Sequence, residues 1–191
     1  MNILVDIGNS NLKYVSLVPN IQENICRTNF SEIALIPTNQ VCDLWMEKNW
    51  KEATKIIVAS VSQFSVVEKI LSWCLQRNKR VVVVESEKQA FGITSGYTNP
   101  KQLGVDRWLA LLGAKVLYPN KNTIIVDSGT ATTVDILSSD GNHIGGWILP
   151  GVNSMQKSIL KDTANVDSQP NTPNLMFGTN SSVNVSNGCW A

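Results

Sequence analysis

Two segments of this chain place an aspartate and a glycine in the same order at the end of an apolar, β-branched run. The first is Ile3-Leu4-Val5-Asp6-Ile7-Gly8, and the second is Ile124-Ile125-Val126-Asp127-Ser128-Gly129. Each run predicts a strand, and the glycine allows a tight reversal with φ above zero. Such a turn presents backbone N–H groups together with a carboxylate, as a nucleotide phosphate and its Mg²⁺ ion require. The repeat therefore predicts two phosphate turns that hold one nucleotide between them.

Either segment taken alone is ordinary hairpin chemistry. The pair is distinguished by the polar residues that follow each turn, where a purely structural hairpin needs none. They are Asn9, Ser10, Asn11 and Lys13 after the first turn, and Thr130, Thr132, Thr133 and Asp135 after the second. Side chains of these kinds line phosphate-binding hairpins, so both turns are candidate ligand sites.

A third candidate lies between the two turns, in the segment Gly104-Val105-Asp106-Arg107. An acidic residue at the start of a helix is often only a favourable terminal charge. Beside two phosphate turns, however, this pair supplies what phosphoryl transfer still needs: a carboxylate to orient and deprotonate an acceptor hydroxyl, and a guanidinium to hold an anionic group. A free aspartate is a weak base with a pKa of about 4. An orienting carboxylate suffices because a loose transition state needs little proton removal before the new bond forms.

The pattern around these candidates predicts an α/β protein rather than a helical bundle. The pattern predicts two hairpin strands at 2–5 and 12–18 and a possible third strand at 24–29. It then predicts a helix at 41–50, a buried parallel strand at 55–61, a second helix at 64–77 and a further strand at 81–85. Asn99-Pro100 is a helix-start signal, and after a break at Gly104 the helix runs to about Leu117. Strands at 122–127, 131–137 and 143–149 then restart the architecture, as a duplicated domain would.

The last of these strands contains a glycine pair within Gly145-Gly146-Trp147-Ile148-Leu149-Pro150-Gly151. Glycines in a strand indicate either a closely approaching ligand or backbone, or a bulge at a corner of the sheet. The segment does not decide between the two. His143, the only histidine, is expected to be a solvated turn residue, since no nucleophile motif accompanies it.

Composition excludes several classes of function. The chain has 191 residues, of which 43% are hydrophobic, so it can form packed cores. Its 16 basic and 15 acidic residues leave a formal charge of +1, which gives no field for nucleic acid or an anionic membrane. The four cysteines have no metal-ligand or redox spacing, and the N-terminus lacks the pattern of a signal peptide. We therefore expect a cytoplasmic protein with reduced thiols.

The candidate segments, taken in order, resemble the motifs of type III pantothenate kinases. The matching segments are Asp6 to Lys13, Tyr97-x-Asn99-Pro100-x-x-Leu103-Gly104-Val105-Asp106-Arg107, Asp127-Ser128-Gly129-Thr130-Ala131-Thr132-Thr133-Val134-Asp135 and Gly145 to Gly151. Ala59-Ser60-Val61 also looks like that family, so the resemblance spans almost the whole chain.

The resemblance implies an actin-like α/β fold of two tandem ribonuclease H-like domains, here 1–118 and 119–191, the second shortened at its C-terminus. It implies that ATP phosphorylates pantothenate in the first step of coenzyme A synthesis, in a homodimer that needs Mg²⁺ and potassium or ammonium. Asp106 matches the proton acceptor and Asp127 the ligand of the monovalent cation. The residues that match ATP contacts are Asp6, Ile7, Gly8, Asn9, Ser10, Asn11, Leu12, Lys13 and Thr130; those that match pantothenate contacts are Tyr97, Gly104, Val105, Asp106, Arg107 and Ser181.

The chain departs from the family pattern near its end. Asn180-Ser181 stands where the family usually has Asn-Thr, so the hydroxyl is kept and the methyl lost. The composition of 180–187 predicts a poor helix, and we expect a fragment or a shortened relative. Two alternatives stay open: a catalytically weak or inactive relative that binds nucleotide as a regulatory or accessory protein, and another member of the sugar kinase, chaperone and actin superfamily. The segment from Tyr97 to Arg107 argues against the second.

Overall fold

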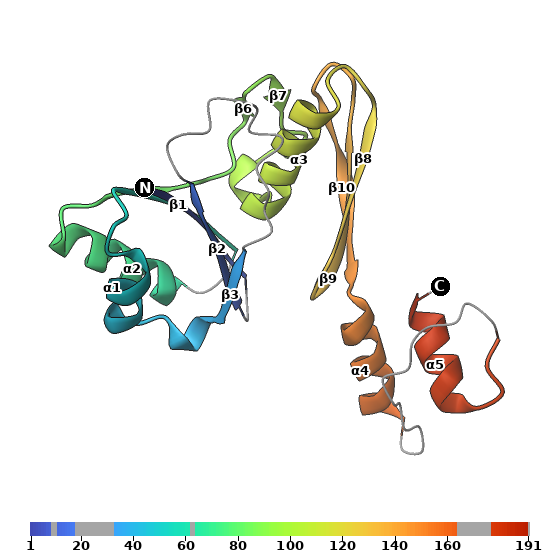
Figure 1. Ribbon diagram of the computed structural model, residues 1–191. Helices are drawn as coiled ribbons and strands as arrows, with labels where there is room; N and C mark the ends of the chain where they lie inside the picture. Colours follow the sequence, from blue (N-terminus) through green and yellow to red (C-terminus); the bar gives the residue numbers. More distant parts are fainter. Residues whose placement is uncertain (9–10, 18–32, 62–63, 164–176, 191) are drawn as a thin grey trace. The chain divides into compact units, whose positions relative to one another are not determined.

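A computed structural model describes residues 1–8, 11–17, 33–61, 64–163 and 177–190 (Figure 1). The chain divides into two compact units, Met1–Pro119 and Asn120–Ala191. Each unit is built on its own sheet, of five strands in the first and three in the second. The strand predicted at 24–29 lies outside the described residues.

The sheet of the first unit has the strand order β3-β2-β1-β4-β5. Its strands are β1 (Asn2–Ile7), β2 (Asn11–Leu17), β3 (Ala34–Pro37), β4 (Lys55–Ser60) and β5 (Arg80–Val83). The first three pair antiparallel, while β4 lies parallel to β1 and β5 parallel to β4. The predicted ranges of β1, β2, β4 and β5 agree with the observed ones to within one or two residues at each end, and the β-branched runs of β1 and β4 form the buried centre of the sheet. The sequence pattern does not predict the strand β3.

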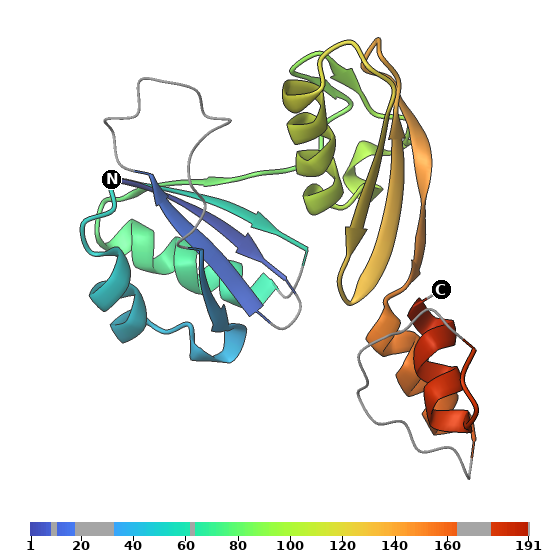
Figure 2. The same cartoon turned by 45° about the vertical axis from the view of Figure 1, so that its right-hand side comes forward.

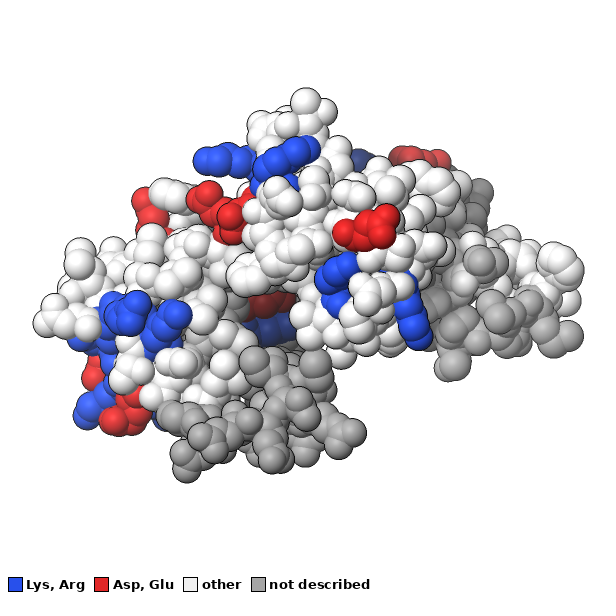
Figure 3. All heavy atoms as spheres, turned by 90° about the horizontal axis from the view of Figure 1, so that it is seen from above, with Lys and Arg blue, Asp and Glu red and all other residues white. Residues whose placement is uncertain are grey.

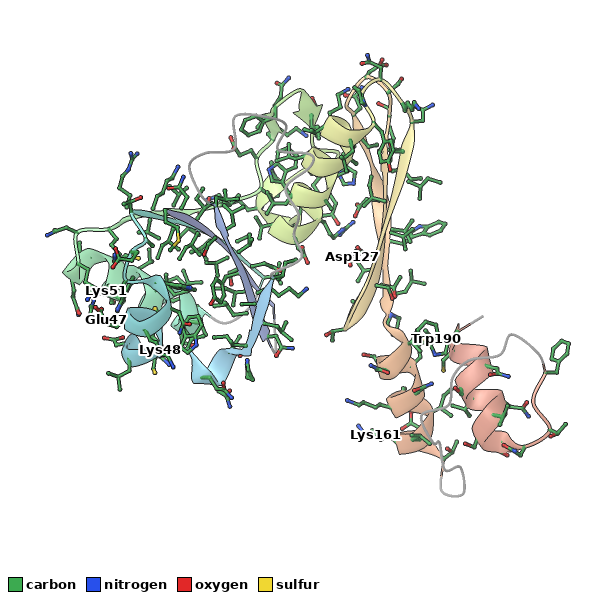
Figure 4. All side chains as sticks on the ribbon, in the orientation of Figure 1. Glu47, Lys48, Lys51, Asp127, Lys161 and Trp190 are labelled. Carbon is green, nitrogen blue, oxygen red and sulfur yellow. The ribbon has the colours of Figure 1, made fainter. Side chains whose placement is uncertain are left out.

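One face of this sheet carries the hydrophobic core. Alternate β1 side chains, Ile3, Val5 and Ile7, are buried there with side chains of helices α1 (Asp43–Trp50) and α2 (Phe64–Gln76). Both helices lie on the same side of the sheet in Figure 1 and Figure 2. Arg77 Nε donates to Glu47 Oε2 at 2.7 Å and so joins the end of α2 to α1, where Figure 4 labels Glu47. The core thus fixes β1 and the turn that follows it.

The chain after β5 forms a short hairpin and then the helix start that the sequence predicts. The hairpin strands are β6 (Gln89–Ala90) and β7 (Ile93–Thr94). Asn99 Oδ1 accepts from Lys101 N at 3.1 Å and caps the 3₁₀ helix η4 (Pro100–Gln102). After the break at Gly104, α3 (Val105–Leu117) begins. The prediction of an interrupted helix start is therefore confirmed.

The second unit is an antiparallel meander followed by two helices. Strands β8 (Thr123–Ser128), β9 (Ala131–Leu137) and β10 (His143–Pro150) lie in the order β10-β9-β8. Helices α4 (Val152–Asp162) and α5 (Ser181–Trp190) pack side by side (Figure 1). The register between β9 and β10 shifts between His143 and Gly145, where Gly145 has a φ of 136°. Of the two explanations for the glycine pair, the structure shows the bulge.

Two expectations about this unit are wrong. His143 is not solvated: it is 2% exposed, and its Nε2 lies 2.8 Å from Asp135 Oδ1. The segment predicted to be a poor helix forms α5, because Asn180 Oδ1 accepts from Val183 N at 2.9 Å and so caps the helix. Packing against α4 then buries Ser186 and Cys189, which outweighs the weak intrinsic propensity of the segment.

The surface and the cysteines agree with the composition. Acidic and basic side chains lie in small groups among uncharged residues on the face shown in Figure 3. Within the described residues, Cys42, Cys74 and Cys189 are free thiols, and burial raises the pKa of Cys74 despite the nearby Lys79. A search of the same residues finds no helix with the length and apolar character needed to cross a membrane.

Candidate functional site

The first Asp-x-Gly turn joins β1 to β2. Asp6 lies opposite Lys13 in the register, and Gly8 N donates to Asn11 O at 2.9 Å. Lys13 Nζ is 3.9 Å from Asp6 Oδ2, and both side chains are about half exposed, at 56% and 49%. Ile7 and Leu12 are fully buried, so only their backbones can contact a ligand. Of the eight residues predicted to contact ATP here, Asn9 and Ser10 lie outside the described residues.

The second turn joins β8 to β9 with similar geometry. Asp127 lies opposite Thr133, and Gly129 N donates to Ala131 O at 2.9 Å. Asp127 is exposed at the end of β8, where Figure 4 labels it. In the part of the chain that the structure describes, no three His, Cys, Asp or Glu residues group together as a metal cluster. Asp127 therefore does not belong to a group of three or more such residues in that part of the chain.

The glycines of both turns serve a purpose other than the one expected. Neither Gly8 nor Gly129 is among the described residues with positive φ, so the left-handed conformation predicted for them is wrong. Each glycine N–H instead closes its turn by donating to a carbonyl a few residues later. A β-carbon on Gly8 would lie 3.4 Å from Asn11 O, so the absence of a side chain leaves the turn tight but unstrained.

A feature that the sequence reasoning missed fixes the second turn against α4. Thr130 O accepts hydrogen bonds from Gly151 N and from Ser154 Oγ, each at 3.0 Å. A β-carbon on Gly151 would collide with the carbonyl oxygen of Gly129 and would lie 2.8 Å from Thr130 O. Gly151 therefore permits the turn and the first turn of α4 to touch. The Pro150-Gly151 pair at the end of a strand was the available signal.

The acceptor candidates come together at the start of α3. Asp106 Oδ1 accepts from Arg107 N at 2.7 Å, and Oδ2 makes no hydrogen bond to the described part of the chain. Arg107 is 5% exposed and donates from Nη1 to Tyr97 Oη at 2.9 Å. Its Cζ also lies 5.7 Å from the centre of the Tyr97 ring. The structure thus places Tyr97, Gly104, Asp106 and Arg107 in one cluster, which is compatible with the shared role that the family resemblance implies for them.

A pocket of about 500 Å³ adjoins this cluster. It lies at the carboxyl ends of β4 and β5 and is lined in part by Ser60, Val61, Glu85, Lys101, Gly104 and Val105. Ligands of open α/β sheets bind outside the carboxyl ends of parallel strands, which is where this pocket opens. Gly104 and Val105, which line the pocket, directly precede Asp106 in the chain, so a pocket of ligand size adjoins the segment that carries this carboxylate.

Ser181 stands apart from the acceptor cluster in the chain. It is the first residue of α5 in the second unit, where it is exposed and follows the capping Asn180. Its hydroxyl is thus available at a helix N-terminus. Thr130 is likewise exposed in the second unit.

Taken together, these features are those expected of one class of protein, the phosphotransferases: an α/β protein with two Asp-x-Gly turns and a carboxylate beside a pocket of ligand size. A sequence model of the family described as type III pantothenate kinase matches residues 2–191. The type III pantothenate kinase of Colwellia psychrerythraea is 41% identical over 192 residues, which cover 100% of this chain and 74% of that protein. The one from Pseudoalteromonas translucida is 37% identical over 98% of this chain and 71% of that protein.

The chain therefore belongs to the type III pantothenate kinase family, a family of enzymes. Among solved structures, a conserved putative Baf family transcriptional activator from Campylobacter jejuni superposes with a TM-score of 0.55 at 21% identity. That match covers 97% of this chain and 72% of the other. At this identity the likeness is one of fold.

Proposed function

We propose that this chain transfers the γ-phosphoryl group of ATP to the primary hydroxyl of pantothenate, giving 4′-phosphopantothenate for coenzyme A synthesis. The observation that carries the proposal is the cluster of Asp106, Arg107 and Tyr97 beside the pocket at the carboxyl ends of β4 and β5. The hydroxyl oxygen bonds to the γ-phosphorus as the bond from that phosphorus to ADP breaks. Asp106 Oδ2 orients the hydroxyl and takes its proton.

Pantothenate also carries a carboxylate, and Arg107 is the group suited to hold it. The buried guanidinium has one nitrogen fixed by Tyr97 Oη, which limits its rotation. A guanidinium whose orientation is fixed in this way can bind a carboxylate with little further loss of entropy. Gly104 and Val105 line the pocket, and the hydroxyl of Ser181 is a further proposed contact.

The nucleotide contacts are assigned to the two turns. Residues 6–13 and the exposed Thr130 are assigned to the phosphate oxygens, because a turn of this kind presents backbone polar groups at its edge. Mg²⁺ is commonly held by one or two carboxylates and by the substrate phosphates, and the half-exposed Asp6 fits that arrangement. Asp127 would hold potassium or ammonium through its carboxylate. The ions supply positive charge to the transferring phosphoryl group.

We also infer that both units are ribonuclease H-like domains, with limits near 1–118 and 119–191. The order β3-β2-β1-β4-β5 and the meander β8-β9-β10 support this, because each unit begins with an antiparallel hairpin that bears an Asp-x-Gly turn. A homodimer and a cytoplasmic location complete the proposal, and neither nucleic acid nor a membrane is an expected partner.

The deciding experiment measures pantothenate-dependent ADP release, with and without potassium, for this chain and for Asp106→Asn. We expect cation-dependent turnover that the substitution abolishes. Binding of ATP without any turnover would contradict the proposal and would favour the nucleotide-binding accessory role. That role would not require the arrangement of Tyr97, Asp106 and Arg107 described above.

A further inference from the structure

We propose that Lys88, together with Ser86, is a positioning residue: it fixes the conformation of the segment from Tyr97 to Arg107, called here the acceptor segment, for binding a carboxylate-bearing substrate. The inference rests on the proposed acceptor role of Tyr97 and Arg107. Neither Ser86 nor Lys88 belongs to any motif that the sequence reasoning singled out. Both follow β5 and lie two residues apart.

Lys88 closes the loop that leads to Tyr97. Its Nζ donates to Ser95 O at 2.8 Å and to Tyr97 O at 3.2 Å. Its backbone carbonyl accepts from Ser95 N at 2.9 Å. Ser95 is 1% exposed, and its Oγ accepts from Tyr97 N at 3.2 Å. The backbone of Tyr97 is therefore held at both its N–H and its carbonyl group.

This fixed backbone bears directly on Arg107. Tyr97 Oη accepts from Arg107 Nη1 at 2.9 Å, and Arg107 Cζ lies over the same ring, 5.7 Å from its centre. A shift of the Tyr97 backbone would move the hydroxyl that orients the guanidinium. Two cationic side chains thus contact one tyrosine, Lys88 at its backbone and Arg107 at its ring.

Ser86 holds the other end of the segment. Its Oγ donates to Leu103 O at 2.8 Å, and both residues are buried. Leu103 directly precedes Gly104, the residue before α3. Lys88 therefore anchors the stretch from Tyr97 to Leu103 at its first residue, and Ser86 anchors it at its last. The proposed substrate contacts are Tyr97 itself and the residues that follow Leu103. Geometry fixed before binding reduces the ordering cost of binding.

The charge of Lys88 adds to this effect. Among the described residues, its ammonium lies within ion-pair distance of no carboxylate and is directed at neutral carbonyls instead. A neutral donor would serve equally to close the loop. An uncompensated positive charge next to Tyr97 favours an anionic ligand group, to a degree limited by solvent because Lys88 is exposed.

The test compares Lys88→Met, Lys88→Arg and Ser86→Ala with the control Lys69→Met, which removes an exposed lysine on α2 away from the site. The readouts are kcat, the KM for pantothenate and for ATP, the pantothenate Kd from calorimetry, and the Tm. We expect Lys88→Met to raise the pantothenate KM and Kd about tenfold, the equivalent of about 1.4 kcal/mol, with the ATP KM unchanged. Lys88→Arg should restore most of the affinity, and Lys69→Met should match the parent.

Two outcomes would overturn the inference: an unchanged pantothenate KM in Lys88→Met, or an equal rise in both KM values with a lowered Tm. The second would mark a purely structural role. Tyr97→Phe and Arg107→Met separate this failure from failure of the proposed site. If they leave the pantothenate Kd unchanged, the acceptor assignment is wrong. If these two variants raise the pantothenate Kd and Lys88→Met does not, only the positioning role of Lys88 is wrong. If Arg107→Met does not fold, the Kd of Tyr97→Phe alone tests the acceptor assignment.

Discussion

Replacing Gly104 with alanine should separate catalysis from folding in this protein. Gly104 precedes α3 with φ −54° and ψ 135°, a conformation that alanine also adopts. The new β-carbon would lie 2.5 Å from Asp106 Oδ1, whereas ordinary contacts begin at 3.4 Å. Because Oδ1 is the end of a side chain, the carboxylate will rotate away and the backbone will stay. The substitution thus displaces the proposed catalytic carboxylate of Asp106 while leaving the backbone in place.

The expected magnitudes follow from that displacement. Moving a reacting group by about 1 Å can cost about 100-fold in rate, so we expect kcat to fall by about that factor. The rotation also breaks the bond of 2.7 Å from Arg107 N to Oδ1. Its loss costs about 1 kcal/mol of stability. Alanine is also a poorer N-cap than glycine, which lowers stability, but it reduces the conformational entropy of the unfolded chain, which raises stability, and these two effects roughly cancel. A change of about 1 kcal/mol lowers the Tm of a chain of this size by about 2–4 °C.

The assay is steady-state ADP release at saturating ATP and pantothenate, with the Tm measured on the same samples. Gly113→Ala is the matched control, since Gly113 lies within α3 and a β-carbon there meets no atom within 4 Å. That control should raise helix stability by about 1 kcal/mol and leave kcat unchanged. The reasoning fails if Gly104→Ala keeps the parent kcat, or if its activity falls only in proportion to the unfolded fraction.

Four further substitutions test other parts of the structure. Asp106→Asn should lower kcat by at least about 100-fold while calorimetry shows unchanged ATP binding; parent turnover would remove this carboxylate from the mechanism. Asp127→Asn should weaken activation by potassium in a cation titration, and an unaltered titration curve would exclude it as the ligand. Gly151→Ala places a β-carbon against backbone oxygens that cannot rotate away, so it should cost about 1–3 kcal/mol and raise the KM for ATP, and a parent-like Tm would contradict the contact. Phe91→Asn should raise the Tm by about 2–4 °C, because Phe91 (φ 50°) and Gly92 (φ 76°) form a two-residue hairpin turn that favours Asn-Gly; a lower Tm would show that the exposed ring makes a stabilising contact.

The sequence predicts the longer strands and the start of α3 well because local signals decide them, whereas it does not predict the short strands β3, β6 and β7. The β-branched runs of β1, β4 and β8 favour strands by intrinsic preference, and burial adds to this in β1 and β4, whereas β8 is largely exposed. Asn99-Pro100 sets its helix start through the hydrogen bond from Lys101 N to Asn99 Oδ1. Failures occur where long-range packing decides. α5 forms because α4 covers one face of it, and no property of 180–187 alone reveals that partner.

His143 and Gly151 illustrate the same limit at the level of single residues. The position of His143 after Gly-Asn predicts a turn residue. In the structure His143 is instead the first residue of β10, beside the bulge at Gly145, and its Nε2 lies 2.8 Å from Asp135 Oδ1 on the neighbouring strand. Gly151 looks like a simple strand end, yet its requirement comes from carbonyls more than twenty positions earlier in the chain. Contacts between residues so far apart cannot be inferred from spacing in one sequence.

The two Asp-x-Gly turns, similar in sequence, differ in the charge beside each aspartate, and this difference supports the different ligands proposed for them. Asp6 lies opposite Lys13, whose ammonium is 3.9 Å away and partly compensates the carboxylate. Asp127 lies opposite Thr133, a neutral residue, and makes no ion pair in the part of the chain that the structure describes. Because both aspartates are substantially exposed, each energy is modest, but the net local charge is close to zero at the first turn and negative at the second. A turn that contains its own cation suits phosphate oxygens, and an uncompensated carboxylate suits a monovalent cation. We therefore expect the first turn to bind phosphate oxygens and the second to bind a monovalent cation, as the proposed binding of a nucleotide with its counterions requires.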